Sequence, residues 1–456
     1  MFWFKKSLPT AIYCQTKLRQ LPHIAVKASN YTILERPEHF HARMLELIDS
    51  ARERITLNLL YLQDDEAGRE ILQALYAAQA RHPQLHIRVY VDFHRAQRGL
   101  IGQDKAAGNA ALYYRMATDC PHPPAIYGVP VKKREIFGVM HLKGCVFDNT
   151  VLYSGASVNN VYLNFAGRYR LDRYHEIYSK DLADCFNDFA TKAFHINFAV
   201  QDFSQGQVKP ARDIKEEIKQ LRRHLTQVHY TFKDNRLRND EVGITPLVGL
   251  GKRGNQLNRT ILWCITAAKR EIFLCTPYFN PPKTLLTALE NALARGVKVT
   301  VVVGDKVAND FYIAPHEKFS AIGAIPYIYE QNLREFITRY QPQVLAGQLK
   351  VMLWQHGNNT YHLKGLFVDN NYALITGNNL NPRAWALDLE NGLLVYDPHH
   401  LMQEKYRHEQ QFILRHTKQI TRADEIDSVE SYPEQVRRIL DKVRRFRASL
   451  IIKQLL

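Results

Sequence analysis

Hydrophobic and polar positions follow two periods along the chain, and together they predict helices and buried strands in regular succession. Apolar residues three and four positions apart predict amphipathic helices over residues 40–53 and 67–81. Apolar runs over residues 55–62 and 86–93 predict buried strands. Strands that alternate with helices indicate an α/β fold with a central, largely buried sheet.

The same succession returns in the second half of the chain. A helix and then a strand are predicted over residues 259–279, a further helix over 284–295 and a further strand over 297–305. The second strand of each half ends in an aspartate, Asp92 or Asp305. The chain is therefore predicted to be a duplication of one α/β unit.

Each half also contains one copy of the pattern H-x-K-x-x-x-x-D. The residues of the two copies are His141, Lys143 and Asp148, and His362, Lys364 and Asp369. Each copy runs into apolar residues typical of a buried strand, whose two-residue period directs the histidine and the lysine to the same face. Two histidines that only fill a core are the alternative, but matched positions inside a repeat argue against it.

In each motif copy, a histidine and a lysine point to the same face of a strand. Two such pairs predict a site for chemistry on phosphate groups. One imidazole can attack a phosphorus atom while the other protonates the departing oxygen. The lysines offset negative charge on the non-bridging oxygens, and each motif aspartate is expected to orient an imidazole by accepting a ring N–H. We expect no metal and no cofactor, because lysine and histidine supply the positive charge and the clustered carboxylates of a binuclear metal site are not seen.

Small polar residues follow both copies after a further predicted strand. Ser157 in the first half corresponds to Asn379 in the second, and Asn159 corresponds to Asn381. Both pairs lie shortly after a glycine, and such turns bring polar side chains close to a ligand. We expect these four residues to contact the substrate.

Four arginines are further candidates for substrate contacts. Arg95 and Arg98 follow the predicted strand that ends at Asp92, a common position for ligand-binding loops. Arg173 lies shortly after the first turn, and Arg383 lies in the second. A guanidinium fork suits pyrophosphate or a carboxylate, and a solvated basic turn is the alternative.

Length and composition indicate the number of domains and the kinds of molecule that the protein can bind. The 456 residues exceed one ordinary core, which predicts two domains. Lys and Arg number 61 against 45 Asp and Glu, so the net charge of +16 favours nucleic acid, an acidic lipid surface or a phosphorylated substrate. Six scattered cysteines fit a reducing cytoplasm. No run of 18 apolar residues occurs, so any membrane contact is expected to be peripheral.

The predicted organisation has five parts. They are a basic lead-in over 1–30, a first unit over 31–202, a charged linker with an exposed helix over 203–243, a second unit over 244–435 and a basic amphipathic helix over 436–456. Seven basic residues and one acid in the last part, set largely against an apolar face, are typical of a helix in an anionic lipid interface. Its candidate membrane contacts are Arg437, Arg438, Lys442, Arg444, Arg445 and Phe446. A helix docked on the protein is the alternative.

The doubled motif and its glycine turns resemble the phospholipase D superfamily, whose members join two such halves. Longer stretches resemble its branch of bacterial type I CDP-diacylglycerol–serine O-phosphatidyltransferases, among them VDFHRAQRGLIG (91–102), CTPYFN (275–280) and TGNNLNPRAWALDLEN (376–391). The resemblance implies two tandem phospholipase D-like domains, each a mixed sheet flanked by helices, with one active site at their interface. It implies transfer of a phosphatidyl group from CDP-diacylglycerol to L-serine through a phosphohistidine, with release of CMP.

The resemblance also implies residue roles. His141 is the implied nucleophile, and Glu390, after the second motif, is implied to contact the site. Glu176 lies in a different context, so the first half is expected to differ there or to use Asp172 or His175. A cardiolipin synthase or a phospholipase D is an alternative, and so is a nuclease or nucleic-acid-binding protein. We expect CDP-diacylglycerol, L-serine and anionic phospholipid as partners of a peripheral enzyme on the inner face of the cell membrane.

Overall fold

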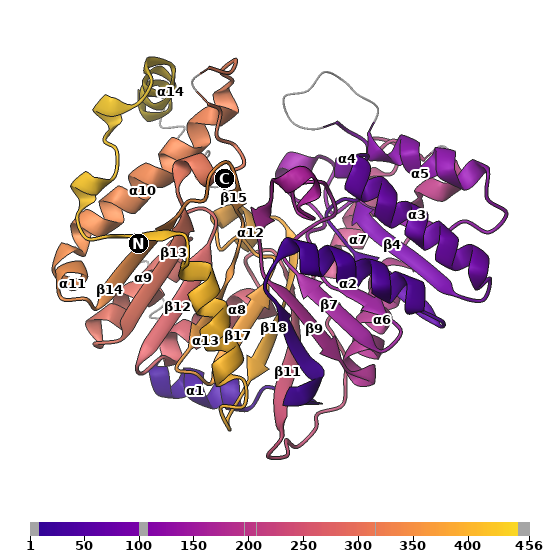
Figure 1. Ribbon diagram of the computed structural model, residues 1–456, viewed down its shortest axis with the longest axis horizontal. Coiled ribbons are helices and arrows are strands. Elements are labelled where there is room, and N and C mark those ends of the chain that lie inside the picture. Colours follow the sequence, from indigo (N-terminus) through magenta and orange to yellow (C-terminus); the bar gives the residue numbers. More distant parts are fainter. Residues whose placement is uncertain (1–8, 100–107, 196, 207, 315, 446–456) are drawn as a thin grey trace.

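The computed structural model describes residues 9–99, 108–195, 197–206, 208–314 and 316–445 (Figure 1). Two large mixed sheets lie side by side with helices packed against them, and Figure 1 shows the N-terminal half (indigo to magenta) beside the C-terminal half (orange to yellow). The predicted α/β fold is confirmed. Within the described ranges, no helix has the length and apolar content that a bilayer span requires.

The first sheet has eight strands in the order β10-β5-β4-β3-β6-β7-β9-β2. Strands β5, β4 and β3 are parallel, and each later neighbour from β6 to β2 is antiparallel to the one before it. The strands predicted at 55–62 and 86–93 are β3 and β4. The bounds are β2 (Tyr31–Leu34), β3 (Arg54–Asn58), β4 (His86–Asp92), β5 (Ala125–Val129), β6 (Cys145–Phe147), β7 (Thr150–Ser154), β9 (Tyr174–Tyr178) and β10 (Gln201–Asp202).

The second sheet repeats this arrangement in nine strands, β1-β11-β18-β17-β16-β12-β13-β14-β19. Its run from β14 to β18 matches the run from β5 to β9 in order and direction, as the predicted duplication requires. The bounds are β1 (Ile24–Lys27), β11 (Glu241–Leu250), β12 (Glu271–Thr276), β13 (Lys298–Gly304), β14 (Leu349–Trp354), β16 (Gly365–Val368), β17 (Tyr372–Thr376), β18 (Leu389–Tyr396) and β19 (Thr417–Ile420). Two short strands, β8 (Arg170–Leu171) and β15 (Thr360–Tyr361), pair in parallel between the halves.

The helices pack on the sheets through apolar faces. In α3, Asp65 caps the first turn by accepting a hydrogen bond from the backbone N–H of Gly68 at 2.9 Å, and Ile71 and Leu72 are buried. The bounds are α1 (Ala11–Arg19), α2 (Pro37–Ser50), α3 (Glu66–Arg81), α4 (Phe93–Ala96), α5 (Asn109–Thr118), α6 (Lys180–Phe194), α7 (Lys215–Leu225), α8 (Gln256–Ala267), α9 (Lys283–Ala294), α10 (Ile325–Arg339), α11 (Gln341–Leu345), α12 (Pro382–Ala386), α13 (Gln403–Leu414) and α14 (Glu434–Arg445).

Two predicted segments differ from expectation. The described part of the predicted lead-in, residues 9–30, belongs to the second half, because α1 packs on α8 and β1 pairs with β11 at the edge of the second sheet. The helix predicted as exposed over 214–232 is α7, which ends at Leu225 and buries Ile218, Leu221 and Leu225. Both segments therefore pack against the folded core, although the charge of the second had suggested an exposed helix.

The C-terminal helix α14 docks on the protein through its apolar face. Val436 and Leu440 are buried in a cluster with Tyr327 of α10 and Tyr432. The expectation that this face enters lipid is therefore wrong for the described residues. Arg437, Arg438 and Lys442 are exposed. The side chains of Arg444 and Arg445, and all of Phe446, lie outside the described part of the chain.

The two halves share one hydrophobic core where they meet. Val146 and Val151 from the first sheet belong to the same buried cluster as Ile375 and Leu393 from the second. Strands β7 and β17 also contact each other at this junction. Because the junction is packed and apolar, it holds the two motif copies in a defined relative position.

Candidate active site

The two motif histidines lie at the junction, and each is anchored by the opposite half. The backbone N–H of His141 donates to the carbonyl oxygen of Leu389, and that of His362 donates to the carbonyl oxygen of Leu171, both at 2.9 Å. Both histidines are buried, with 6% exposure. One site therefore forms only when both halves are in place.

The imidazole of His141 contacts a carboxylate from the second half. Its Nδ1 lies 2.9 Å and 3.0 Å from the two oxygens of Glu390, which is fully buried. Burial and nearby Asp388 raise the pKa of Glu390 well above its ordinary value, whereas burial and Lys143 lower the pKa of His141. The pair therefore shares one proton at neutral pH. Because Nε2 makes no hydrogen bond to any described residue, its lone pair is available for attack.

His362 has a different set of partners. Its Nδ1 lies 2.9 Å from the Tyr162 hydroxyl and 3.5 Å from Asp172 Oδ2, and it also contacts Lys364 Nζ. Burial and Lys364 lower the pKa of His362 to about 4. This imidazole is therefore neutral at pH 7, and its Nε2 makes no hydrogen bond to the described residues.

Asp172 is the first-half carboxylate that faces a motif histidine, as Glu390 does in the second half. The other residue that the sequence offered, His175, lies in β9 and pairs through Nε2 with Glu409 at 3.2 Å. Glu176 forms an ion pair with helix α2 and is not at the site. The carboxylate therefore comes from the loop between β8 and β9 in one half and from a strand, β18, in the other.

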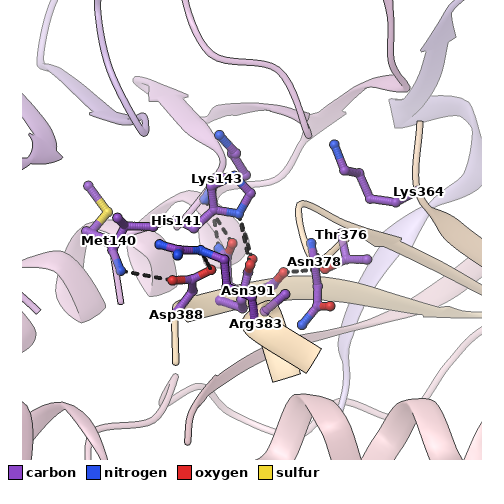
Figure 2. A network of polar contacts seen from close by, with 12 residues as sticks. Met140, His141, Lys143, Lys364, Thr376, Asn378, Arg383, Asp388 and Asn391 are labelled. Atoms are coloured by element: carbon purple, nitrogen blue, oxygen red, sulfur yellow. Dashed lines mark hydrogen bonds and ion pairs between the residues drawn. The ribbon is translucent and has the colours of Figure 1, made fainter. Parts of the chain in front are cut away.

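Burial lowers the pKa of both motif lysines, and the charge of Lys364 lowers that of Lys143 further. Lys143 Nζ donates to Ser157 Oγ at 3.0 Å, and Lys364 Nζ donates to Asp172 Oδ2 at 3.2 Å. Burial and Lys364 lower the pKa of Lys143 to about 7. Figure 2 shows both side chains extending in the same direction above the turn that carries Asn378. A phosphate placed between these cations would offset their mutual repulsion.

The motif aspartates are not at the site, and the expectation that they orient the imidazoles is wrong. The carboxylate of Asp148 accepts hydrogen bonds from the backbone N–H groups of residues 52–54 at 2.9–3.0 Å. Asp369 does the same for residues 269–271. Both have positive φ angles, 49° and 54°, in the turn at the far end of the short strand that follows each motif lysine. They fix the start of β3 and β12.

Of the four predicted turn residues, some lie in the site and others hold the backbone beside it. Ser157 lies in the site through its contact with Lys143. Asn159 and Asn381 each use the side-chain oxygen to accept a backbone N–H three residues later, which for Asn381 caps α12. Asn379 has a buried side-chain oxygen that finds no hydrogen-bond partner among the described residues.

Two asparagines that the sequence did not single out also line the site. Asn391 brackets the backbone of Lys143, since its Oδ1 accepts from the Lys143 N–H and its Nδ2 donates to the Lys143 carbonyl, both at 2.8 Å (Figure 2). Asn378 is fully buried, and its Nδ2 has no hydrogen-bond partner in the described chain. Such an N–H is a candidate donor to a phosphate oxygen. The repeat offered no signal for Asn378, because Ala156 occupies the matching position.

Two of the four predicted arginines are committed to protein partners. Arg173 donates to both carboxylate oxygens of Glu409 at 2.6 Å and 2.9 Å and to the carbonyl of Leu374 at 3.0 Å. The prediction that Arg173 contacts substrate is wrong, because this buried ion pair ties the first half to α13. Arg98 donates to both oxygens of Glu135 at 2.5 Å, so its charge is balanced locally.

The predicted substrate contacts of Arg95 and Arg383 stay predictions. Arg95 is buried, its guanidinium lies 4.5 Å from the ring centre of Tyr61, and its Nη1 has no partner among the described residues. Arg383 pairs with Asp388 at 3.2 Å and donates to the carbonyl oxygens of residues 135 and 136. It therefore ties α12 to the segment that leads into His141 (Figure 2).

The arrangement is suited to a two-step transfer at phosphorus. Two imidazoles, each held at Nδ1, and two lysines lie within one buried junction, where low dielectric strengthens their effect on a phosphate. Within the described ranges, no three His, Cys, Asp or Glu side chains are grouped so that they could hold a metal ion.

Comparisons with known proteins agree with this geometry. A family model described as "Cardiolipin synthase, PLD-like domain" matches residues 44–192 and 261–413. The CDP-diacylglycerol–serine O-phosphatidyltransferases of Haemophilus influenzae and Escherichia coli are 43% and 42% identical to the chain, over 97% of its length and 98% of theirs. The crystal structure of phosphatidylserine synthase from Haemophilus influenzae matches with a TM-score of 0.94 at 42% identity, covering 98% of this chain and 100% of that one.

Proposed function

The chain belongs to the family of CDP-diacylglycerol–serine O-phosphatidyltransferases with two PLD-like domains, and from this premise we propose the route by which it makes phosphatidylserine. It transfers the phosphatidyl group of CDP-diacylglycerol to L-serine and releases CMP. The route has two steps, with the phosphatidyl group held covalently on His141 between them. The observation that carries it is the contact between Glu390 and His141 Nδ1, which leaves Nε2 to attack.

In the first step, His141 Nε2 attacks the phosphorus that carries diacylglycerol. The bond to the CMP phosphate oxygen breaks, and His362 gives its proton to that departing oxygen. Lys143, Lys364 and Asn378 face the same space and offset the charge that gathers on the non-bridging oxygens. Glu390 stabilises the cationic imidazole that forms as the N–P bond is made.

In the second step, the serine hydroxyl attacks the same phosphorus. His362, now neutral, takes the hydroxyl proton, the new P–O bond forms and the N–P bond to His141 breaks. Phosphatidylserine leaves, and both histidines return to their first states. Because its pKa is lowered, His362 is unprotonated at neutral pH and has a lone pair that can accept this proton. Its earlier role as an acid is supported by the substrate, whose two negative phosphates favour the protonated imidazole.

Trapping the intermediate tests the route. The enzyme is mixed with CDP-diacylglycerol labelled in the phosphatidyl group, quenched within one turnover and digested, and the labelled peptide is sequenced. We expect label on His141 and none in the His141→Ala variant. Label on His362 would reverse the roles of the two histidines, and product without any labelled enzyme would contradict a covalent route.

The acceptor separates this proposal from a cardiolipin synthase or a phospholipase D. CMP release and lipid product are measured with L-serine, with glycerol, with phosphatidylglycerol or with water alone. We expect phosphatidylserine as the main product when serine is present. A product that is only phosphatidic acid would favour a phospholipase D.

We also infer that the protein docks peripherally on the inner face of the cell membrane. Ile136 and Phe137 in the short helix η2 (Glu135–Phe137) are about half exposed, and Lys133 and Arg134 just before them are exposed. This segment leads directly into His141. Apolar side chains flanked by cations suit an anionic lipid interface, where each basic residue contributes about 1 kcal/mol. The exposed basic residues of α14 can add to this attraction.

Vesicle binding tests the docking. Serine in place of both Ile136 and Phe137 is expected to weaken sedimentation with vesicles rich in anionic phospholipid and to leave activity on detergent-solubilised substrate unchanged. Tyr178→Ser is the control, because Tyr178 is 55% exposed but lies at the far end of β9, beside Thr150. Equal binding by all three proteins would contradict a role for η2.

A further inference from the structure

We propose that Arg170 and Asp310 form the subsite that recognises the α-carboxylate and the α-ammonium group of L-serine beside His362. The inference rests on the proposed function and adds the residues that select its acceptor. Arg170 belongs to β8 in the first half, and Asp310 follows the short helix η5 (Lys306–Ala308) in the second. The subsite, like the histidine pair, therefore exists only where the two halves meet.

The two side chains face each other without closing a hydrogen bond. Arg170 Nη1 lies 3.6 Å from Asp310 Oδ2, which is beyond hydrogen-bond length. The other atoms are held in place, because Arg170 Nε donates to Thr360 Oγ1 at 3.1 Å and Asp310 Oδ1 accepts from the Tyr278 hydroxyl at 2.5 Å. Within the described chain, Arg170 Nη1 and Nη2 and Asp310 Oδ2 make no hydrogen bond.

Both charges are accessible, and both are present at neutral pH. The side chains of Arg170 and Asp310 are 15% and 18% exposed, more than the catalytic histidines and lysines beside them. Burial acts to raise the pKa of Asp310, but Arg170 and His362 outweigh it and keep that pKa below its ordinary value. A positive and a negative group thus stand ready for a ligand that carries one of each.

Aromatic rings connect this pair to the reacting histidine. The Arg170 guanidinium lies 5.0 Å from the ring centre of Tyr162, whose hydroxyl is 2.9 Å from His362 Nδ1. The ring of Tyr278, which holds Asp310, has its centre 5.9 Å from that of His362. A small molecule that contacts both Arg170 and Asp310 therefore lies next to the base that must receive the acceptor's proton.

Serine is an acceptor that can bind both members of this pair, its carboxylate to Arg170 and its ammonium group to Asp310. Its carboxylate and ammonium sit on one carbon, and its hydroxyl is one carbon further on, so both charges can be held while the hydroxyl reaches His362. Water or glycerol has neither charge and gains nothing from the pair. A buried or partly buried arginine and carboxylate left without a polar ligand also lose hydrogen bonds, which adds discrimination against neutral acceptors.

The test compares transfer to serine with a partial reaction that needs no serine. Arg170→Gln, Asp310→Asn and the conservative Arg170→Lys are prepared as full chains, with Arg168→Gln as the matched control because Arg168 is exposed two residues away. Exchange of labelled CMP into CDP-diacylglycerol reports the first step alone. We expect kcat/KM for L-serine to fall about 10- to 100-fold in Arg170→Gln and Asp310→Asn, mainly through KM, with CMP exchange within about twofold of wild type.

Serine analogues then assign each charge. Wild type is expected to prefer L-serine over L-serinamide and over 3-hydroxypropionate. Arg170→Gln should lose the preference over serinamide, and Asp310→Asn should lose the preference over 3-hydroxypropionate. The proposal is overturned if KM for serine is unchanged, or if exchange and serine transfer fall together, because an ion pair that only holds the halves would do that. A wild-type enzyme that exchanges CMP but makes no phosphatidylserine would instead overturn the proposed function.

Discussion

Replacing Glu390 with glutamine separates the role of this carboxylate from that of the motif aspartate. Glu390 is fully buried and presents both oxygens to His141 Nδ1 within 3.0 Å. Glutamine keeps the shape, but its amide N–H favours the wrong imidazole tautomer, with the proton on the attacking Nε2. Loss of the carboxylate in a histidine–carboxylate pair lowers kcat by up to about 10⁴-fold, or about 5 kcal/mol. We expect a fall of about 10³- to 10⁴-fold.

The assay is CMP release from CDP-diacylglycerol in a single turnover, with the melting temperature measured on the same samples. Glutamine keeps the shape of Glu390 and one hydrogen bond to His141, so we expect a small change in melting temperature. Asp148→Asn is the contrasting variant, because its carboxylate accepts three backbone N–H groups away from the site. It should lose about 1–3 kcal/mol of stability and keep kcat within about twofold. A Glu390→Gln variant that retains a tenth of wild-type kcat would contradict the role of Glu390 in orienting His141. An Asp148→Asn variant that loses activity at an unchanged melting temperature would contradict the position of Asp148 away from the site.

Three further outcomes follow from the geometry. Burial acts to raise the pKa of Glu409, but Arg173 and His175 together outweigh it and lower that pKa to about 2. The ion pair with Arg173 therefore stabilises the fold fully above about pH 4.5 and is lost as pH falls through 2; urea unfolding of Glu409→Gln should show a weaker pH dependence in that window. The pKa of His362, about 4, should rise by about 1–3 units when CDP binds, as followed by NMR of the imidazole nitrogens. Gly377→Ala should lower kcat more than tenfold and leave binding to anionic vesicles unchanged, because its methyl group would lie 2.7 Å from Lys143 Cγ.

The strands and the duplication could be predicted because they rest on local patterns. The buried strands of both halves are apolar runs bounded by polar turns, and each predicted strand falls on an observed one within a few residues. The motif histidines and lysines were found for the same reason, since a repeat at matched positions marks a shared structural role. Ser157, next to Lys143, was found through the repeat as well.

The partners of the histidines could not be derived from strand periodicity. Asp148 stands at the expected spacing, but the strand after Lys143 is only three residues long, so its end carries Asp148 away from the site. The carboxylate that does meet His141 comes from residue 390, through a contact between halves that are far apart in sequence. Only the family resemblance pointed to Glu390, and no local pattern indicated Asn378 or Tyr162.

Basic charge did not reveal how the segments at the two ends of the chain pack. The sequence left the structure of the lead-in open and predicted that the C-terminal helix lies in an anionic lipid interface. Instead β1 extends the second sheet, and Val436 and Leu440 pack on α10. An amphipathic pattern states that one face avoids water, but it does not say whether protein or lipid covers that face.

The two halves match in their strands but differ in what surrounds each histidine, and this difference supports unequal roles. His141 has one carboxylate, held within 3.0 Å by both oxygens, which suits a nucleophile that must carry positive charge through the intermediate. His362 shares its Nδ1 among Tyr162, Lys364 and a carboxylate 3.5 Å away, and its lowered pKa keeps it neutral at pH 7. A histidine that must both give and take a proton needs surroundings in which its two protonation states can interchange, rather than a carboxylate that holds it in one state. The acceptor pair that we propose also lies on the His362 side, so the group that takes the serine proton and the groups that select serine form one unit.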